Sequence, residues 1–117
     1  MTARHPGPEA QGPHPRHRLD PRIHAPVRLS IVACLAAADK AEFGFVRDAV
    51  EVSDSVLSRQ MTLLADAGYV RVKKGYVGKR PRTWLSLTPV GRRAFDSHMA
   101  ALAAIAARAA APATSDA

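Results

Sequence analysis

Eight basic side chains fall within residues 67–93, and no acidic residue interrupts them. The chain has 117 residues and a formal net charge of +7, so this one block exceeds the charge of the whole chain. Closely spaced Lys and Arg without acidic neighbours suit a polyanion, because each contact with a phosphate releases a counterion. A surface that is basic only for solubility is the alternative interpretation.

Residues 54–67 hold a second set of candidate side chains. Leu57, Met61 and Leu64 form an apolar stripe at helical spacing, and the opposite face is polar with one formal charge. Polar groups of this kind read the edges of bases in a major groove. An ordinary amphipathic surface helix is the alternative. The candidates for contacts with bases or nearby phosphates are Ser55, Ser58, Arg59, Gln60 and Thr62.

The basic block itself supplies candidates for binding phosphates or entering a minor groove. These are Lys73, Lys74, Lys79, Arg80 and Arg82. They lie in and around a glycine-bearing loop between two segments with strand-like patterns, 69–74 and 83–87, which together predict a β-hairpin with a charged tip.

Helical patterns surround this hairpin. The spacing of apolar residues predicts a helix from Pro26 to about residue 38, a polar break at 39–42 and a short helix over 43–50. Ser53 is an expected N-cap for the next helix, which Gly68 ends. Thr88 and Pro89 begin a last, alanine-rich helix that continues to about residue 111.

In this order the elements resemble a winged helix-turn-helix, and the residues are similar to MarR/ArsR-type transcriptional regulators over about 24–108. Segments 57–64, 64–70, 79–84 and 87–92 resemble the recognition helix, its junction with the wing, the wing and the exit into the last helix. One departure is Glu51, where such turns often carry Gly. The resemblance implies an α+β, mainly α fold with a two-stranded wing and a C-terminal dimerisation helix.

The last helix carries an apolar seam that indicates self-association, either alone or together with the first helix. Packing within one chain is the alternative. The residues expected at a homodimer interface are Ile31, Leu35, Phe95, Met99, Leu102 and Ile105.

Other chemistry has little support in the sequence. Cys34 is the only cysteine and is expected to be a small buried hydrophobe rather than a redox sensor. Asp96 and His98 resemble half of the metal site of some ArsR-type sensors, but the matching second pair is missing. We therefore expect no metal site, no cofactor and no catalytic site.

These patterns predict a cytoplasmic, homodimeric regulator that binds specific double-stranded DNA, with 54–67 in the major groove and 73–83 on the backbone or minor groove. A winged-helix adaptor for protein partners is the alternative. No membrane contact is expected, and the sequence identifies no small-molecule effector. The predicted organisation is a disordered Pro/His/Arg-rich arm over 1–23, the winged domain over 24–111 and a disordered tail over 112–117.

Overall fold

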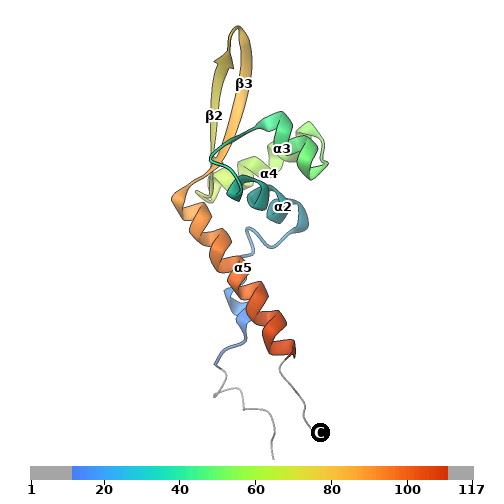
Figure 1. The fold of residues 1–117 in the computed structure, drawn as a ribbon, viewed down its shortest axis with the longest axis vertical. Helices are drawn as coiled ribbons and strands as arrows, with labels where there is room; N and C mark the ends of the chain where they lie inside the picture. The colour runs from blue at the N-terminus through green and yellow to red at the C-terminus, as the bar shows by residue number, and fades with distance from the viewer. Residues whose placement is uncertain (1–11, 111–117) are drawn as a thin grey trace, which may run out of the picture. The chain divides into compact units, whose positions relative to one another are not determined.

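The computed structural model describes residues 12–110 (Figure 1). The elements are η1 (Pro15–Arg18), α2 (Pro26–Ala36), β1 (Ala41–Glu42), α3 (Phe43–Val50), α4 (Asp54–Asp66), β2 (Val70–Val77), β3 (Arg80–Leu87) and α5 (Pro89–Ala110). This is a mainly helical α+β fold with one small antiparallel sheet, so the predicted fold class is confirmed. The described chain divides into two units, 20–96 and 12–19 with 97–110.

The core of unit 20–96 lies where the helices meet the sheet. Leu57 and Leu64 of α4 are fully buried together with Val46 of α3 and Leu85 of β3. Ile31 and Leu35 of α2 are also fully buried in this core. The expectation that these two α2 side chains face a second copy is therefore corrected, because neither is exposed in the single chain. The helical spacing that suggested an interface is the spacing of a stripe that faces the core.

The sheet has three strands in the order β1-β3-β2, one more than the predicted two-stranded wing. β1 is only two residues long, and Ala41 and Glu42 pair with Leu85 and Trp84 of β3. A strand this short has no alternating pattern, so the sequence presented it as part of a polar break. Figure 1 shows the longer β2–β3 hairpin projecting beyond α2, α3 and α4.

The base of the hairpin is joined to the start of α5 by a compact set of contacts. Thr88 Oγ1 donates to the Gly68 carbonyl at 2.6 Å and accepts from the Gly91 amide at 2.9 Å. A Cβ atom at Gly91 would lie 2.0 Å from the Tyr69 carbonyl oxygen. Gly91 is therefore required by the close approach of α5 to the backbone of the β2 entrance.

The ordered part of the chain begins before Pro26. Residues 12–23 are ordered, which corrects the prediction of disorder over this part of 1–23. In unit 20–96, Ile23 is fully buried and the Tyr69 hydroxyl donates to Asp20 at 2.5 Å. In the other unit, Pro15 of η1 is buried. Predictions for residues 1–11 and 111–117 lie outside the described residues.

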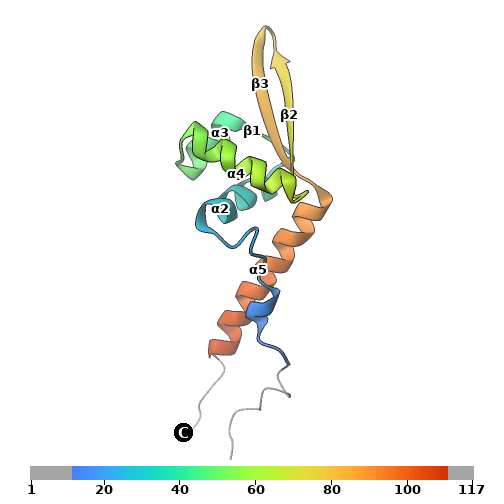
Figure 2. The same ribbon diagram turned by 180° about the vertical axis from the view of Figure 1, so that it is seen from behind.

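The smaller unit combines η1 with the C-terminal part of α5, which lie side by side in Figures 1 and 2. Arg108 Nη2 donates to the Gly12 carbonyl at 3.1 Å. Composition alone favoured disorder here, but a proline-rich segment can be ordered by a neighbouring helix that buries its rings and satisfies its carbonyl groups.

Candidate nucleic-acid interface

The turn between α3 and α4 positions the predicted recognition helix. Glu51 has a left-handed backbone conformation with φ 62°, and the next amide, that of Val52, donates to the Arg47 carbonyl at 3.1 Å. This is the conformation that Gly favours, so the turn retains the geometry of a glycine turn although Glu51 replaces Gly. Ser53 then caps α4 by accepting from the Val56 amide at 3.2 Å, as predicted.

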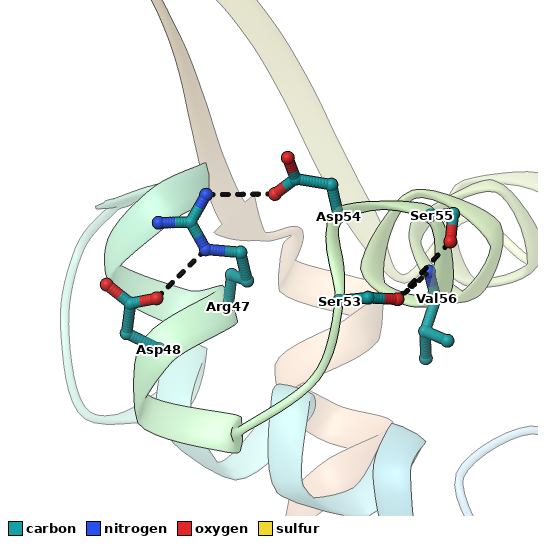
Figure 3. Close-up of polar contacts among 6 residues, drawn as sticks. All are labelled: Arg47, Asp48, Ser53, Asp54, Ser55 and Val56. Atoms are coloured by element: carbon teal, nitrogen blue, oxygen red, sulfur yellow. Dashed lines mark hydrogen bonds and ion pairs between the residues drawn. The ribbon is translucent and has the colours of Figure 1, made fainter.

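Arg47 connects the two helices of the motif (Figure 3). Its guanidinium donates through Nε to Asp48 and through Nη1 to Asp54, each at 2.9 Å. The hydrogen bonds that Arg47 donates to Asp48 and Asp54 raise the pKa of Arg47, and the one to Asp48 lowers the pKa of that carboxyl. Asp54, a carboxylate that would repel a phosphate, is thus paired with a cation. No periodic pattern in the sequence signals this contact.

Four of the five predicted α4 residues share the exposed side of the helix. Ser55, Ser58, Arg59 and Thr62 are all exposed. The Thr62 hydroxyl donates to the Ser58 carbonyl at 3.1 Å, which leaves its oxygen free to accept.

Gln60 lies apart from these four residues. It is half-buried, and its Oε1 accepts from Arg28 Nη1 of α2 at 3.1 Å. Arg28 also donates to the Arg22 carbonyl at 2.7 Å. Gln60 therefore joins α4 to α2 and to the preceding segment, and a contact between Gln60 and a base stays a prediction.

The predicted wing residues also divide into an exposed group and one residue that is paired within the chain. Lys73, Lys74, Lys79 and Arg80 are exposed. Arg82 is instead half-buried, and its Nε lies 3.3 Å from Glu42 Oε2. The pair connects β3 to the short β1 strand, a contact that could not be foreseen while β1 itself was unrecognised.

A groove of about 390 Å³ separates α4 from the hairpin. Ser58, Thr62 and Asp66 line it from α4, and Val72, Lys74 and Thr83 line it from the strands. The polar helix face and the basic hairpin therefore border one continuous surface. In such an arrangement a helix suited to a DNA groove lies beside a hairpin suited to the phosphate backbone.

The tip of the hairpin holds two exposed apolar side chains that we did not predict as contacts. Val77 pairs with Arg80, so the turn consists of Gly78 and Lys79, with φ 64° at Gly78. Tyr76 is 75% exposed and Val77 is 53% exposed beside these cations. The signal in the sequence that could have identified these two residues as contacts is their position beside Gly78 in a basic loop.

Comparison with known proteins identifies the fold. The family model described as a winged helix DNA-binding domain matches residues 27–106. The chain belongs to this family. An uncharacterized protein of Methanocaldococcus jannaschii is 29% identical over 73 residues, which cover 62% of this chain and 79% of that protein.

Solved structures of winged-helix regulators agree. A transcriptional regulator homologue from Pyrococcus horikoshii OT3 has a TM-score of 0.71 and 25% identity, over 75% of this chain and 87% of that one. A MarR-family transcriptional regulator from Silicibacter pomeroyi has a TM-score of 0.59 and 25% identity, over 86% of this chain and 67% of that one. The winged-helix protein is thus a MarR-like, DNA-binding transcriptional regulator, and its family and fold point away from an enzyme.

The other candidates that the sequence raised are Cys34 and the Asp96–His98 pair. Cys34 is half-buried, and burial raises the pKa of its thiol, which reduces the thiolate available for redox chemistry. His98 is buried. Within residues 12–110, no three His, Cys, Asp or Glu side chains gather as a group that could hold a metal ion. No helix in the described part of the chain is long and apolar enough to cross a bilayer.

Proposed function

We propose that this winged-helix protein is a sequence-specific regulator of transcription that binds double-stranded DNA as a homodimer. In this proposal α4 enters the major groove and the β2–β3 hairpin contacts the backbone and minor groove. The observation that carries the proposal is the continuous surface of the exposed α4 face and the exposed wing cations. Base contacts come from Ser55, Ser58, Arg59 and Thr62, and phosphate contacts come from Lys73, Lys74, Lys79 and Arg80.

The test is selection of bound duplexes from a random pool, followed by affinity measurements at several salt concentrations. We expect one preferred sequence whose affinity falls steeply as salt rises. Arg59→Gln should relax the preference at particular base pairs, whereas Lys79→Gln should weaken binding to all sequences. Failure to bind any duplex at low salt would contradict the proposal and favour the protein-adaptor alternative.

The wing tip is expected to add an apolar contact with the sugars or bases of the minor groove. Tyr76→Ala should weaken binding about fivefold without changing its salt dependence, because an uncharged side chain releases no counterion. Lys79→Gln is the matched comparison and should reduce the salt dependence. A change in the salt dependence of the Tyr76 variant would exclude an apolar contact.

The homodimer is proposed to form through α5. Met99 is 42% exposed, and Leu102 and Ile105 are half-buried in the single chain, so an apolar surface stays available for a second copy. Phe95 contributes less, because it packs against the core of unit 20–96. A two-fold dimer would present two α4 helices to half-sites about one helical turn apart.

Light scattering coupled to size-exclusion chromatography tests this interface. We expect a dimer for the natural chain and a monomer for a Met99→Glu/Leu102→Glu variant. Ser97→Glu adds the same kind of charge at an exposed polar position of α5 and should leave the dimer intact. A monomeric natural chain at micromolar concentration would contradict this part of the proposal.

A further inference from the structure

The face of the hairpin that points away from α4 carries its own set of side chains. Trp84 of β3 pairs with Lys73 of β2, and Arg71 pairs with Ser86. Residues directly opposite each other in an antiparallel pair share a face of the sheet. Val72 and Leu85, which line the groove beside α4, alternate to the other face. The wing therefore presents cations on both faces. The cations on the face opposite α4 do not belong to the groove between α4 and the hairpin.

A depression of about 390 Å³ lies on this second face. Lys40, Arg71, Lys73, Trp84 and Ser86 line it, and Gly75 leaves one wall open. A Cβ atom added at Gly75 would meet no heavy atom within 4 Å. The Lys40 ammonium lies 4.7 Å from the centre of the Trp84 ring, so a cation–π contact holds this cation at the depression.

The charge of this depression is strongly unbalanced. Four cations, Lys40, Arg71, Lys73 and Lys74, line the depression with one carboxylate, that of Asp39, so the formal charge of the lining is +3. Glu42, the other acidic residue of this region, pairs with Arg82. A phosphate monoester carries a charge of about −1.5 to −2 at neutral pH, so it balances this site better than a carboxylate does.

We propose that this depression, which we call the outer wing site, binds a phosphate monoester that carries an aromatic ring, as a nucleotide does. Arg71, Lys73 and Lys40 bind the phosphate, and Ser86 donates a further hydrogen bond. The ring lies against the Trp84 indole in the space that Gly75 leaves open. The volume of the depression lies within the range of small-molecule sites, roughly 300–1,000 Å³.

Occupation of the outer wing site would also change DNA binding. This second step rests on the proposed function, because Lys73 belongs to the proposed phosphate contacts of the wing. A bound dianion neutralises Lys73 and its neighbours and so weakens the attraction of the wing for DNA. The ligand would then act as a negative effector, and DNA would in turn weaken binding of the ligand.

Trp84 is the only tryptophan of the chain, so its fluorescence reports on the site directly and without DNA. The full chain is titrated with phenyl phosphate, and inorganic phosphate, benzoate and benzyl alcohol serve as partial mimics. We expect saturable quenching by phenyl phosphate, with at least tenfold weaker binding of each mimic. Equal binding of inorganic phosphate would overturn the assignment of the ring. Equal binding of benzoate or benzyl alcohol would overturn the assignment of the phosphate.

Three variants locate the binding. Arg71→Gln removes one cation at an exposed position, and Gly75→Val fills the open wall; each should weaken phenyl phosphate binding about tenfold. Lys79→Gln removes the same charge at the turn, outside the lining residues, and should leave binding within twofold. Equal weakening by Lys79→Gln would reveal a diffuse electrostatic effect and overturn the site. Circular dichroism is the control for the folding of each variant.

Addition of phenyl phosphate to the protein–DNA complex tests the second step. Release of DNA from the natural chain, absent in Gly75→Val, supports the effector role. Quenching without DNA release overturns the effector role and leaves the site intact. A chain that binds phenyl phosphate and no DNA would contradict the proposed function while supporting the outer wing site. Absence of quenching, with DNA binding intact, would refute the outer wing site alone.

Discussion

The helix-turn-helix and the wing of this protein use charge in opposite ways. Arg47 of α3 is bound to Asp48 of the same helix and to Asp54 of α4. The exposed side of α4 carries mostly uncharged polar groups. In the wing, Arg82 pairs with Glu42, while Lys73, Lys74, Lys79 and Arg80 are exposed in a segment that contains no acidic residue. Charge thus stabilises the shape of the helical motif and remains available for a ligand on the hairpin.

This difference teaches how recognition is divided between the two regions. A helix that reads bases must hold its side chains in fixed positions, so its supporting ion pairs and its Ser53 cap matter more than its net charge. A hairpin that attracts a polyanion needs unpaired cations more than fixed geometry. Four changes, described from the largest expected effect to the smallest, test this division.

The wing depends on its base for stability, and Gly91→Ala is the strongest test of that dependence. The added methyl group would collide with the Tyr69 carbonyl, because the Cβ position lies 2.0 Å from that oxygen. We expect a loss of about 3 kcal/mol in the free energy of unfolding, measured by urea denaturation. Val90→Ala, at an exposed neighbouring position, is the control and should change stability little.

Removal of two tip cations tests the role of wing charge. Lys79→Gln/Arg80→Gln should lower DNA affinity at least about tenfold and reduce the slope of log affinity against log salt by about 2. Thermal stability should stay the same, because both side chains are exposed. An unchanged salt slope would show that these cations do not contact phosphates. It would contradict the view that the exposed cations of the wing are there to bind a polyanion.

Glu51→Gly tests the turn of the helical motif. Glu51 is the one non-glycine residue with positive φ among the described residues. A side chain in this conformation costs about 1 kcal/mol, so Gly should raise the free energy of unfolding by about that amount. DNA affinity should change little, because the turn geometry is retained. Destabilisation by Gly would mean that the Glu51 side chain contributes a contact outweighing its backbone strain.

Arg47→Gln should have the smallest effect, and that effect should depend on pH. The hydrogen bond from Arg47 lowers the pKa of Asp48 below its usual 3.8. The stabilisation is therefore present above pH 3.8 and is lost as pH falls through the lowered value. We expect the melting temperature of the variant to lie slightly below that of the natural chain at pH 7 and to match it in strong acid.

Arg59→Gln, at an exposed position of α4, is the control for that measurement. Its melting temperature should follow that of the natural chain at every pH. A pH-independent difference between Arg47→Gln and the natural chain would assign the role of Arg47 to packing rather than to its ion pairs.

The fold could be predicted where local chemistry repeats along the chain. The Leu57 stripe, the Ser53 cap and the Thr88–Pro89 start of α5 follow from helical periodicity and capping, and the structure contains all of them. β1 could not be predicted, because two residues show no period. The contact of Gln60 with Arg28 spans 32 residues, and nothing in the local sequence signals it.

The sequence by itself determined the order of the main helices and the basic hairpin, because periodicity, caps and charge are properties of neighbouring residues. The winged helix was what this order resembled. Tertiary structure alone decided which of its polar groups are available. It assigned Ile31 and Leu35 to the core, Gln60 to Arg28, Arg82 to Glu42 and Asp54 to Arg47. It also gathered Lys40, Arg71 and Lys73 around Trp84. The physical reason is that exposure and pairing depend on which distant segments pack together, and a pattern of neighbouring residues does not contain that information.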